Sequence, residues 1–335
     1  MKNFCALGLT LGLTALLTSG LTAQTPTRLV VAGKGAPLVV DALFTFPSLR
    51  PLLASSVKPD QGFGLFLSVV DPGFTAKATL DKNAGAETYA AAKGDLYLLK
   101  STVKVPLGAS IEALGLKTLY LDLESPEGFY RDLANLGSAL GAGARAAEVT
   151  AYYKGLQADT EKRVAGLAKP KVLLAQSVDN GQAWDVAPAN WMQARLVEMA
   201  GGTNVGQSER GAGWTRVGAE QIAVWNPEVV IVVSYSADAA GAAKAFRSDP
   251  RFAQTVAVKA GAVHAMAQDF YSWDQADTRW ILGLRRIASF LHPDRFADVD
   301  AGAEARRFFE FLYGVNPASF DTSIRPQLKG EHGVP

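Results

Sequence analysis

The sequence predicts an α/β protein with two Rossmann-like lobes, each built on a parallel sheet, joined by a single long α-helix. Three observations predict this fold. Short apolar runs alternate with amphipathic stretches, the pattern of parallel strands covered by helices on both faces. A proline-free stretch, 144–168, lies in the middle of the chain, and the segments 85–100 and 218–233 on either side of it resemble each other.

The length and charge of the chain exclude several classes of protein. Its 335 residues are enough for two domains with their own cores. Lys and Arg number 33 against 32 Asp and Glu, so the net charge of +1 argues against a nucleic-acid partner. The 48% hydrophobic content excludes a disordered chain.

The segment 1–23 predicts a cleaved signal peptide, and therefore a periplasmic or secreted protein of the cell envelope. Lys2 is its only charge, an apolar run covers 5–17, and small residues precede Gln24. The alternative is a membrane anchor, which the five Ser and Thr and the three Gly of this segment weaken. Cleavage removes Cys5, the only cysteine, so we expect no disulfide and no thiolate site.

Apolar and amphipathic runs then give the elements in order. The strand candidates are 28–32, 96–99, 118–121, 172–175, 229–233 and 262–266. The helix candidates are 37–46, 126–140, 191–200, 219–225 and 277–291.

The stretch 144–168 predicts the helix that joins the lobes. It is rich in Ala, Glu, Lys and Arg, and it lies between Gly143 and Pro170, which are good helix boundaries. Such a helix is about 36 Å long, the diameter of a small domain. It separates an N-terminal lobe, 24–143, from a C-terminal lobe, 169–335, on which the tail beyond Arg307 is expected to pack.

The segments 85–100 and 218–233 predict an internal duplication. Both begin Gly-Ala-Glu and end in an apolar strand, and Asp95 and Glu228 fall at equivalent positions. The alternative is chance similarity between two α/β units. Duplication would make the two lobes pseudo-symmetric.

Five motifs, taken in their order and spacing, resemble the periplasmic solute-binding proteins of ABC importers, in the group for iron-siderophores, haem, cobalamin and metal oxyanions. The motifs are 112–122, 199–204, 214–222, 225–228 and 258–264. The resemblance covers nearly all of the chain after the signal peptide. It implies a monomer that binds a small molecule between two lobes and delivers it to a permease dimer, without catalysis.

Two glutamates, Glu87 and Glu220, occupy equivalent positions in the two repeats. The resemblance implies that they dock on arginines of the two permease subunits. The alternative is that both stabilise the positive N-terminal ends of short helices.

Loops after the strands supply the candidate ligand contacts. Lys34 lies in a glycine-flanked loop suited to an anion. Lys100, Ser101 and Tyr235 follow the two equivalent strands, where ligands bind in open α/β lobes. The loop aromatics Trp184 and Trp214 add flat apolar surface. Plain surface turns are the alternative at each position.

The segment 269–274 is the strongest of these candidates. It offers Tyr271, Trp273 and Asp274, and Arg279 follows it. The alternative is an aromatic plug over the core of the C-terminal lobe.

Loop aromatics favour a ferric siderophore, haem or cobalamin, whereas four cations, Lys34, Lys100, Arg216 and Arg279, would suit a molybdate- or tungstate-like oxyanion. The sequence leaves both open. Its three histidines have no metal-ligand spacing, so neither a bound metal ion nor a cofactor is expected. A hydrolase using Asp269 and Asp274 is the alternative from another class.

Overall fold

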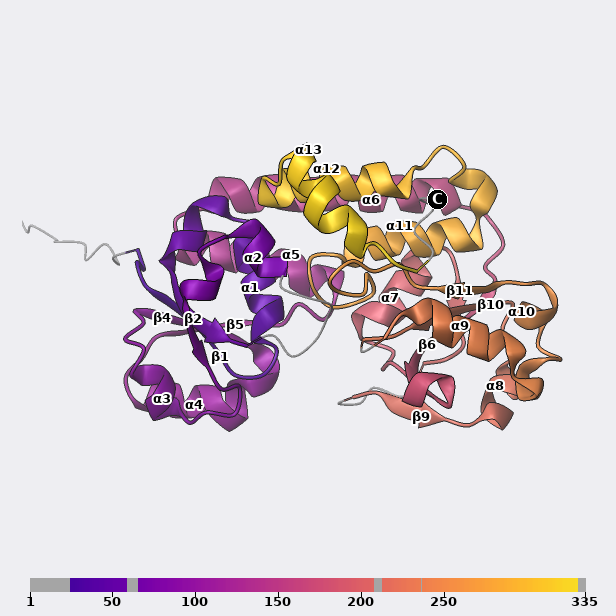
Figure 1. Cartoon of the computed structure of the whole chain (residues 1–335), viewed down its shortest axis with the longest axis horizontal. Coiled ribbons are helices and arrows are strands. Elements are labelled where there is room, and N and C mark those ends of the chain that lie inside the picture. The colour runs from indigo at the N-terminus through magenta and orange to yellow at the C-terminus, as the bar shows by residue number, and fades with distance from the viewer. Residues whose placement is uncertain (1–24, 59–65, 208–212, 236, 331–335) are drawn as a thin grey trace, which may run out of the picture.

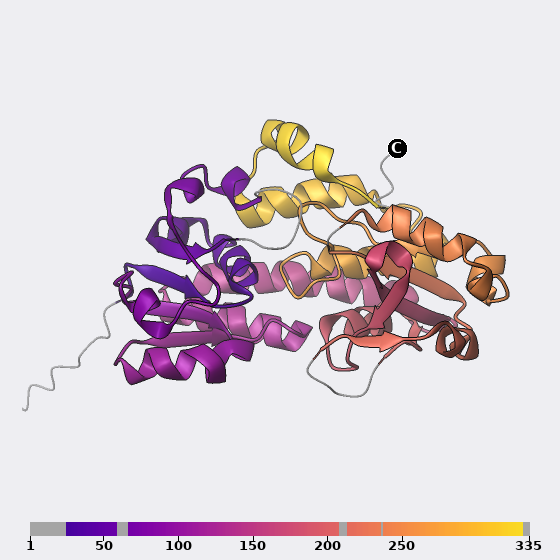
Figure 2. The same cartoon turned by 60° about the horizontal axis from the view of Figure 1, so that its bottom comes forward.

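The computed structural model describes residues 25–58, 66–207, 213–235 and 237–330, so the expected signal peptide lies outside the described residues. Two α/β lobes lie side by side, and the long helix α6 (Gly143–Val164) runs along both of them (Figures 1 and 2). The predicted α/β fold class is confirmed. No helix within the described residues is long and apolar enough to span a bilayer.

The N-terminal lobe contains a parallel sheet in the order β3-β2-β1-β4-β5. Its central strands β1 and β4 are buried along their whole length, as their continuous apolar runs predict. The strands are β1 (Leu29–Ala32), β2 (Leu53–Val57), β3 (Ala78–Leu80), β4 (Leu96–Lys100) and β5 (Thr118–Leu121).

The second sheet, in the C-terminal lobe, is mixed and not wholly parallel as expected. Its order is β11-β10-β6-β7-β9, with β8 beside β6, and β7 runs antiparallel to both β6 and β9. The reason is the tight reversal after β6, where Asp179 and Gly181 have φ of 52° and 88°. A parallel connection would need a dozen or more residues. The strands are β6 (Lys171–Val178), β7 (Ala183–Val186), β8 (Thr203–Asn204), β9 (Thr215–Val217), β10 (Val229–Val233) and β11 (Val263–Ala265).

Helices cover the sheets of both lobes, and the helix Ala301–Tyr313 packs on α6, where the rings of Phe311 and Tyr152 stack with centroids 4.6 Å apart (Figure 1). Those of the first half are α1 (Ala36–Phe44), α2 (Phe66–Val70), α3 (Ala86–Ala90), α4 (Ala109–Ala113) and α5 (Pro126–Ala139). Those after α6 are α7 (Met192–Met199), α8 (Ala219–Trp225), α9 (Ala239–Ser248), α10 (Val256–Lys259), α11 (Trp280–Leu291), α12 (Ala301–Tyr313) and α13 (Pro317–Ser319).

Helix α6 bridges the lobes through contacts near its two ends. Near its start, the Arg145 guanidinium donates to the carbonyl of Thr45 in the N-terminal lobe at 2.9 Å. Near its end, Arg163 pairs with Asp298 in the C-terminal half at 2.7 Å. The helix stops four residues earlier than predicted, because Ala165 leaves the helical backbone and Gly166 adopts a φ of 74°.

The two repeats have matching local structure. Asp95 precedes β4 and accepts hydrogen bonds from the backbone N–H groups of Thr27 at 2.8 Å and Arg28 at 3.0 Å, which lead into β1. Glu228 precedes β10 and accepts from the N–H of Lys171, the first residue of β6, at 2.8 Å. Each lobe therefore uses one carboxylate to tie its two central strands together, as a duplication predicts.

The C-terminal tail packs on more than the predicted C-terminal lobe. The Arg50 guanidinium of the N-terminal lobe donates to the carbonyl of Tyr313 at 2.8 Å, and Arg145 donates to that of Phe311 at 2.6 Å. Phe66 in α2 contacts the Phe309 and Tyr313 rings, with centroids 5.6 and 5.0 Å away. Helix α12 thus contacts the N-terminal lobe as well, because its aromatic face fills a gap beside α2, and one apolar core runs through both lobes.

Candidate ligand-binding site

The glycine-flanked loop after β1 presents Lys34 to solvent. Gly33 and Gly35 both have a φ of 77°, which glycine adopts without strain. The N–H of Gly33 already donates to the hydroxyl of Tyr89 at 3.0 Å. The loop therefore offers an ammonium group to an anion, but not the free Gly33 amide that a backbone cradle would need.

Lys100 ends β4 and is buried, with 3% of its side chain exposed. Its Nζ donates to Oε1 of Glu124 at 2.6 Å and to the carbonyl of Asp122. Gly35 makes room for it, since a Cβ there would lie 2.7 Å from the Lys100 Cγ. The charge of Lys100 is thus neutralised inside the lobe, while Ser101 beside it stays half-buried.

A pocket of about 470 Å³ opens beside this loop. Lys34 and Glu87 both line it, so a predicted ligand contact and a predicted docking residue share one hollow. Its walls include Gly33, Lys34, Lys82, Glu87, Val103 and Leu107. Charged groups of both signs over an apolar floor suit an amphipathic molecule better than a bare ion.

In the C-terminal lobe, a polar cluster centred on Asp274 follows the carboxyl end of β10. The Tyr235 hydroxyl donates to Oδ2 of Asp274 at 2.6 Å, Ser272 donates to Oδ1 at 2.5 Å, and Gln193 donates to Oδ2 at 3.3 Å. Burial raises the pKa of Asp274 more than these donors lower it. Burial, and next to it the charge of Asp274, raise the pKa of Tyr235, which therefore stays protonated as a donor.

Two tryptophans extend this cluster toward solvent. Trp214 lies edge-on to Tyr235 with centroids 5.9 Å apart, and Trp191 lies edge-on to Trp214 at 6.2 Å. All three side chains are half-buried. Trp191 was not among the predicted ligand contacts, because no local signal distinguishes its position just before α7 from that of a core tryptophan.

The two lobes contact each other beside this cluster through helices α5 and α7. Nη2 of Arg195 in α7 lies 3.9 Å from Oε1 of Glu127 in α5. Glu124, which pairs with Lys100 in the N-terminal lobe, adds to the raised pKa of Tyr235 in the C-terminal lobe, although burial is the larger cause. Lys100, with Ser101 next to it in the chain, and Tyr235 therefore lie on the facing sides of the two lobes.

Trp184 lies in β7 and not in a loop, which corrects the prediction. Its ring packs against Phe246 and Phe252, with centroids 5.0 and 6.4 Å away, and only 2% of the residue is exposed. The antiparallel turn after β6 carries it back into a second, smaller apolar core of the C-terminal lobe, which also contains Phe246 and Phe252, so it is not positioned to contact a ligand.

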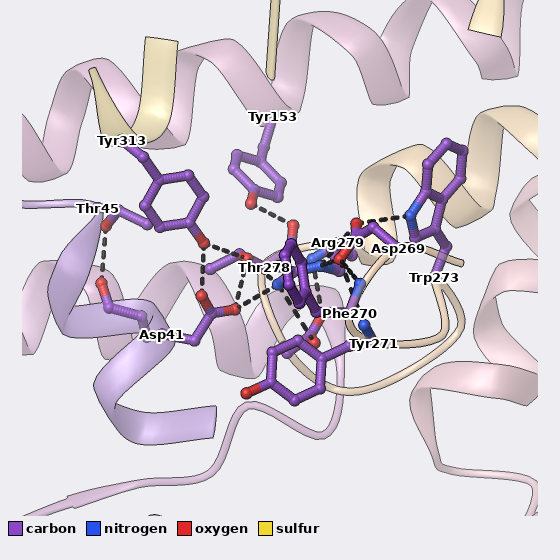
Figure 3. A network of polar contacts seen from close by, with 12 residues as sticks. Asp41, Thr45, Tyr153, Asp269, Phe270, Tyr271, Trp273, Thr278, Arg279 and Tyr313 are labelled. Carbon is purple, nitrogen blue, oxygen red and sulfur yellow. Dashed lines mark hydrogen bonds and ion pairs between the residues drawn. The ribbon is translucent and has the colours of Figure 1, made fainter. Parts of the chain in front are cut away.

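Tyr271, Trp273 and Arg279 also lie in the interior and not on a loop facing solvent, which corrects the expected placement (Figure 3). Arg279 donates through Nε to Asp269 at 2.7 Å and through Nη1 to Asp41 at 2.9 Å. The Trp273 indole donates to Asp269 at 2.9 Å. The segment matches the aromatic-plug alternative, extended by an ion-pair network.

The carboxylate pair of the hydrolase alternative lies in the same interior. Asp269 and Asp274 are both fully buried and accept hydrogen bonds from protein groups. Hydrolysis of a glycoside by general acid–base catalysis needs two carboxylates that reach the scissile bond. The arrangement gives that alternative no support.

Glu87 and Glu220 are exposed in the first turns of α3 and α8. The two helices lie on the side of the molecule opposite α6 (Figure 1). This placement suits both the docking and the helix-dipole interpretations. No group of three or more metal-binding side chains occurs among the described residues.

Comparison with known proteins identifies the family. The family model described as periplasmic binding protein matches residues 74–269. No curated protein sequence matches the chain. Among solved structures, the ABC transporter solute binding protein of Sulfurospirillum deleyianum aligns with a TM-score of 0.71 and 19% identity, over 89% of this chain and 94% of its own.

Two similar structures carry ligand names. The molybdate periplasmic binding protein MolA of Haemophilus influenzae, bound to molybdate, aligns with a TM-score of 0.66 and 15% identity, over 86% of this chain and 93% of its own. A periplasmic haem-binding protein of Pseudomonas aeruginosa aligns with a TM-score of 0.59 and 18% identity, over 80% and 93%. These likenesses share the fold described above, and the family match spans more than half of the sequence. The chain belongs to the periplasmic binding protein family.

Proposed function

We propose that this protein captures an organic metal chelate, such as a ferric siderophore, haem or cobalamin, between the carboxyl edges of its two sheets and delivers it to an importer permease. The observation that carries the proposal is the half-buried aromatic group Trp191–Trp214–Tyr235, which lies at the carboxyl edge of the second sheet. Aromatic faces of this kind bind the flat rings and aryl groups of chelates.

The charges at the site favour a chelate over a small oxyanion. Three of the four candidate cations are already paired: Lys100 with Glu124, Arg216 with Asp185, and Arg279 with Asp41 and Asp269. A small oxyanion needs uncompensated donors to replace its hydration shell. Lys34 is exposed and forms no ion pair with a described residue, so it is the cation that could meet a carboxylate of a chelate.

Titration of tryptophan fluorescence tests the ligand class. The panel is a ferric catecholate, a ferric hydroxamate, haemin, cyanocobalamin, molybdate and tungstate. We expect one chelate to quench the fluorescence, and Trp214→Ala to weaken its binding by about tenfold or more, as removal of a stacking partner worth 1–2 kcal/mol would. Trp184→Phe is the matched control, because Trp184 lies inside the second core.

Binding of molybdate or tungstate alone would support the oxyanion alternative. Unchanged chelate affinity in Trp214→Ala would show that the aromatic group does not contact the ligand. Lys34→Ala tests the contribution of the lysine apart from that of the aromatic group, since it should weaken the binding only of chelates that carry a free carboxylate.

We further propose that the permease dimer docks on the face that carries Glu87 and Glu220. Four of the large apolar side chains exposed on the described part of the chain lie on or next to the elements that carry these glutamates. They are Val105, Leu114, Val224 and Val256. Val224 lies one turn after Glu220 on α8, and the N–H of Val256 donates to Asn226, which caps that helix. Each lobe thus offers one carboxylate beside exposed aliphatic surface.

Stimulation of ATP hydrolysis by the cognate importer in nanodiscs tests this docking. We expect Glu87→Ala with Glu220→Ala to lower the stimulation at least tenfold while chelate affinity stays unchanged, because orientation depends on the charges. Glu148→Ala, an exposed glutamate on α6, is the control. Equal loss of chelate binding and stimulation would show that the two glutamates are structural.

A further inference from the structure

Arg279 carries a fully buried charge, and its partners come from distant parts of the chain. Its side chain has no exposed surface. Asp41 comes from α1 in the N-terminal lobe, whereas Asp269 comes from the loop that precedes α11. Tyr313, at the end of α12, donates to the other oxygen of Asp41 at 2.7 Å (Figure 3).

Neighbouring groups complete the connection. Thr278 donates to Asp41 at 2.7 Å and lies 2.6 Å from the Tyr313 hydroxyl. The Tyr153 hydroxyl of α6 donates to the carbonyl of Thr278 at 2.5 Å. One polar cluster therefore ties together α1, α6, α12 and the loop before α11.

Aromatic rings enclose the guanidinium and exclude water from it. Its carbon lies 4.3 Å from the Phe66 centroid, 4.8 Å from that of Tyr271 and 5.5 Å from that of Phe309. A charge in such a place cannot lose its partner cheaply, because the remaining charge would stay buried and unpaired. Separation of the lobes at this point would require that loss.

The same loop also reaches the proposed ligand site. Asp269 holds Arg279, and Asp274, five residues later, holds Tyr235. Helix α11 fixes the loop from behind, since a Cβ on Gly283 would lie only 2.1 Å from the Trp273 carbonyl oxygen. The loop therefore links the wall of the ligand site to the contact between the lobes.

We propose that Asp41, Arg279 and Tyr313 form a clasp that fixes the angle between the lobes, with α12 acting as a second strap besides α6. The ligand-binding surface is then preformed, and the lobes keep one relative orientation before any ligand arrives. This inference goes beyond the proposed function, because it concerns the protein alone and holds whatever the ligand is.

Electron–electron distance measurement tests the clasp on the full chain. Cys5 is the only cysteine, so Cys5→Ser provides a background for two labels, placed by Thr88→Cys on α3 and Gln221→Cys on α8, both exposed. We expect one narrow distance distribution in the parent. Asp41→Asn and Tyr313→Phe should broaden it or shift its mean by more than about 2 Å, the size of a hinge rearrangement.

The matched control changes a buried carboxylate whose partners lie within one lobe. Asp132 of α5 accepts hydrogen bonds from the backbone N–H groups of Asp122 at 2.5 Å and Leu123 at 2.9 Å, all in the N-terminal lobe. Asp132→Asn should lower the Tm and leave the distance distribution of the parent intact.

Folding of each variant is checked by circular dichroism. Tyr313→Phe removes one hydroxyl and keeps the ring, so it decides the matter if Asp41→Asn does not fold. A parent-like distribution in folded Tyr313→Phe and Asp41→Asn would overturn the clasp. A broad distribution in the parent itself would overturn it as well.

Discussion

Single residues show where local sequence stops being informative. Trp184 and Arg279 were both predicted at the ligand site, yet both lie in the interior. A charged residue is normally exposed, and only its partners reverse that preference. Arg279 is buried because of Asp41, which lies 238 positions earlier in the chain, so no pattern around Arg279 could reveal it. Lys34 is exposed as predicted, because its glycine-flanked turn is a local feature.

Asp277 gives a prediction of pH dependence. Burial raises its pKa well above the usual range, against the opposing charge of Arg279. The folded state then holds a proton that the unfolded state releases near pH 3.9, so stability should fall as pH rises above that value. We expect Asp277→Asn to gain stability relative to the parent between pH 4 and 8 in urea unfolding. A constant difference across this range would contradict the raised pKa.

Substitution of Trp184 should mainly lower stability, whereas substitution of Trp214 should mainly weaken ligand binding. Trp184→Ala removes a ring packed on Phe246 and Phe252 and should cost about 3–5 kcal/mol of unfolding free energy. Trp214→Ala, at a half-buried position, should cost less than half of that. Thermal unfolding of the two variants side by side measures the difference, and equal losses would place Trp214 in the core.

At the scale of elements, the sequence predicted what depends on local pattern. The apolar runs of β1, β4, β6 and β10 and the composition of α6 were sufficient to locate them. The antiparallel strand β7 was missed, because four residues with one tryptophan carry little periodicity. The polar cluster around Asp274 and Tyr235 was predicted in part, since these two residues follow strands, but Gln193 comes from the first turn of α7.

Removal of either carboxylate that joins strands in the two repeats should lower the free energy of unfolding by a similar amount. Asp95→Ala and Glu228→Ala should each cost about 1 kcal/mol at pH 7, the low end for charged hydrogen bonds because both groups are exposed. Burial raises the pKa of Asp95, but the N–H donors of Thr27 and Arg28 outweigh it, so the net shift is downward.

The stabilisation by Asp95 is therefore present above pH 3.9 and is lost as pH falls through its lowered pKa. Urea unfolding at pH 7 and pH 3 should show the effect of Asp95→Ala shrinking at the lower pH. An effect of the same size at both would mean that the carboxylate charge plays no part.

At the scale of the molecule, the duplicated lobes and α6 follow from the sequence, whereas the path of the tail does not. Phe308 and Phe309 mark an apolar helix face, but nothing local says which lobe covers it. The structure places that face against both, so the predicted packing on the C-terminal lobe was only part of its surroundings.

The predicted signal peptide gives an expected N-terminus for the mature chain. If residues 1–23 are a signal peptide, mass spectrometry of the protein from the periplasm should give an N-terminus near Gln24. A full-length mass in the membrane fraction would instead identify an anchor.

The return of α12 to the first lobe has a consequence for the order in which the chain folds. Asp41 and Phe66 both contact Tyr313, which is synthesised about 250 to 270 positions later. The N-terminal lobe therefore cannot finish folding until nearly the whole chain has been synthesised. That delay would suit a chain that crosses a membrane unfolded and assembles afterwards, as the predicted signal peptide implies.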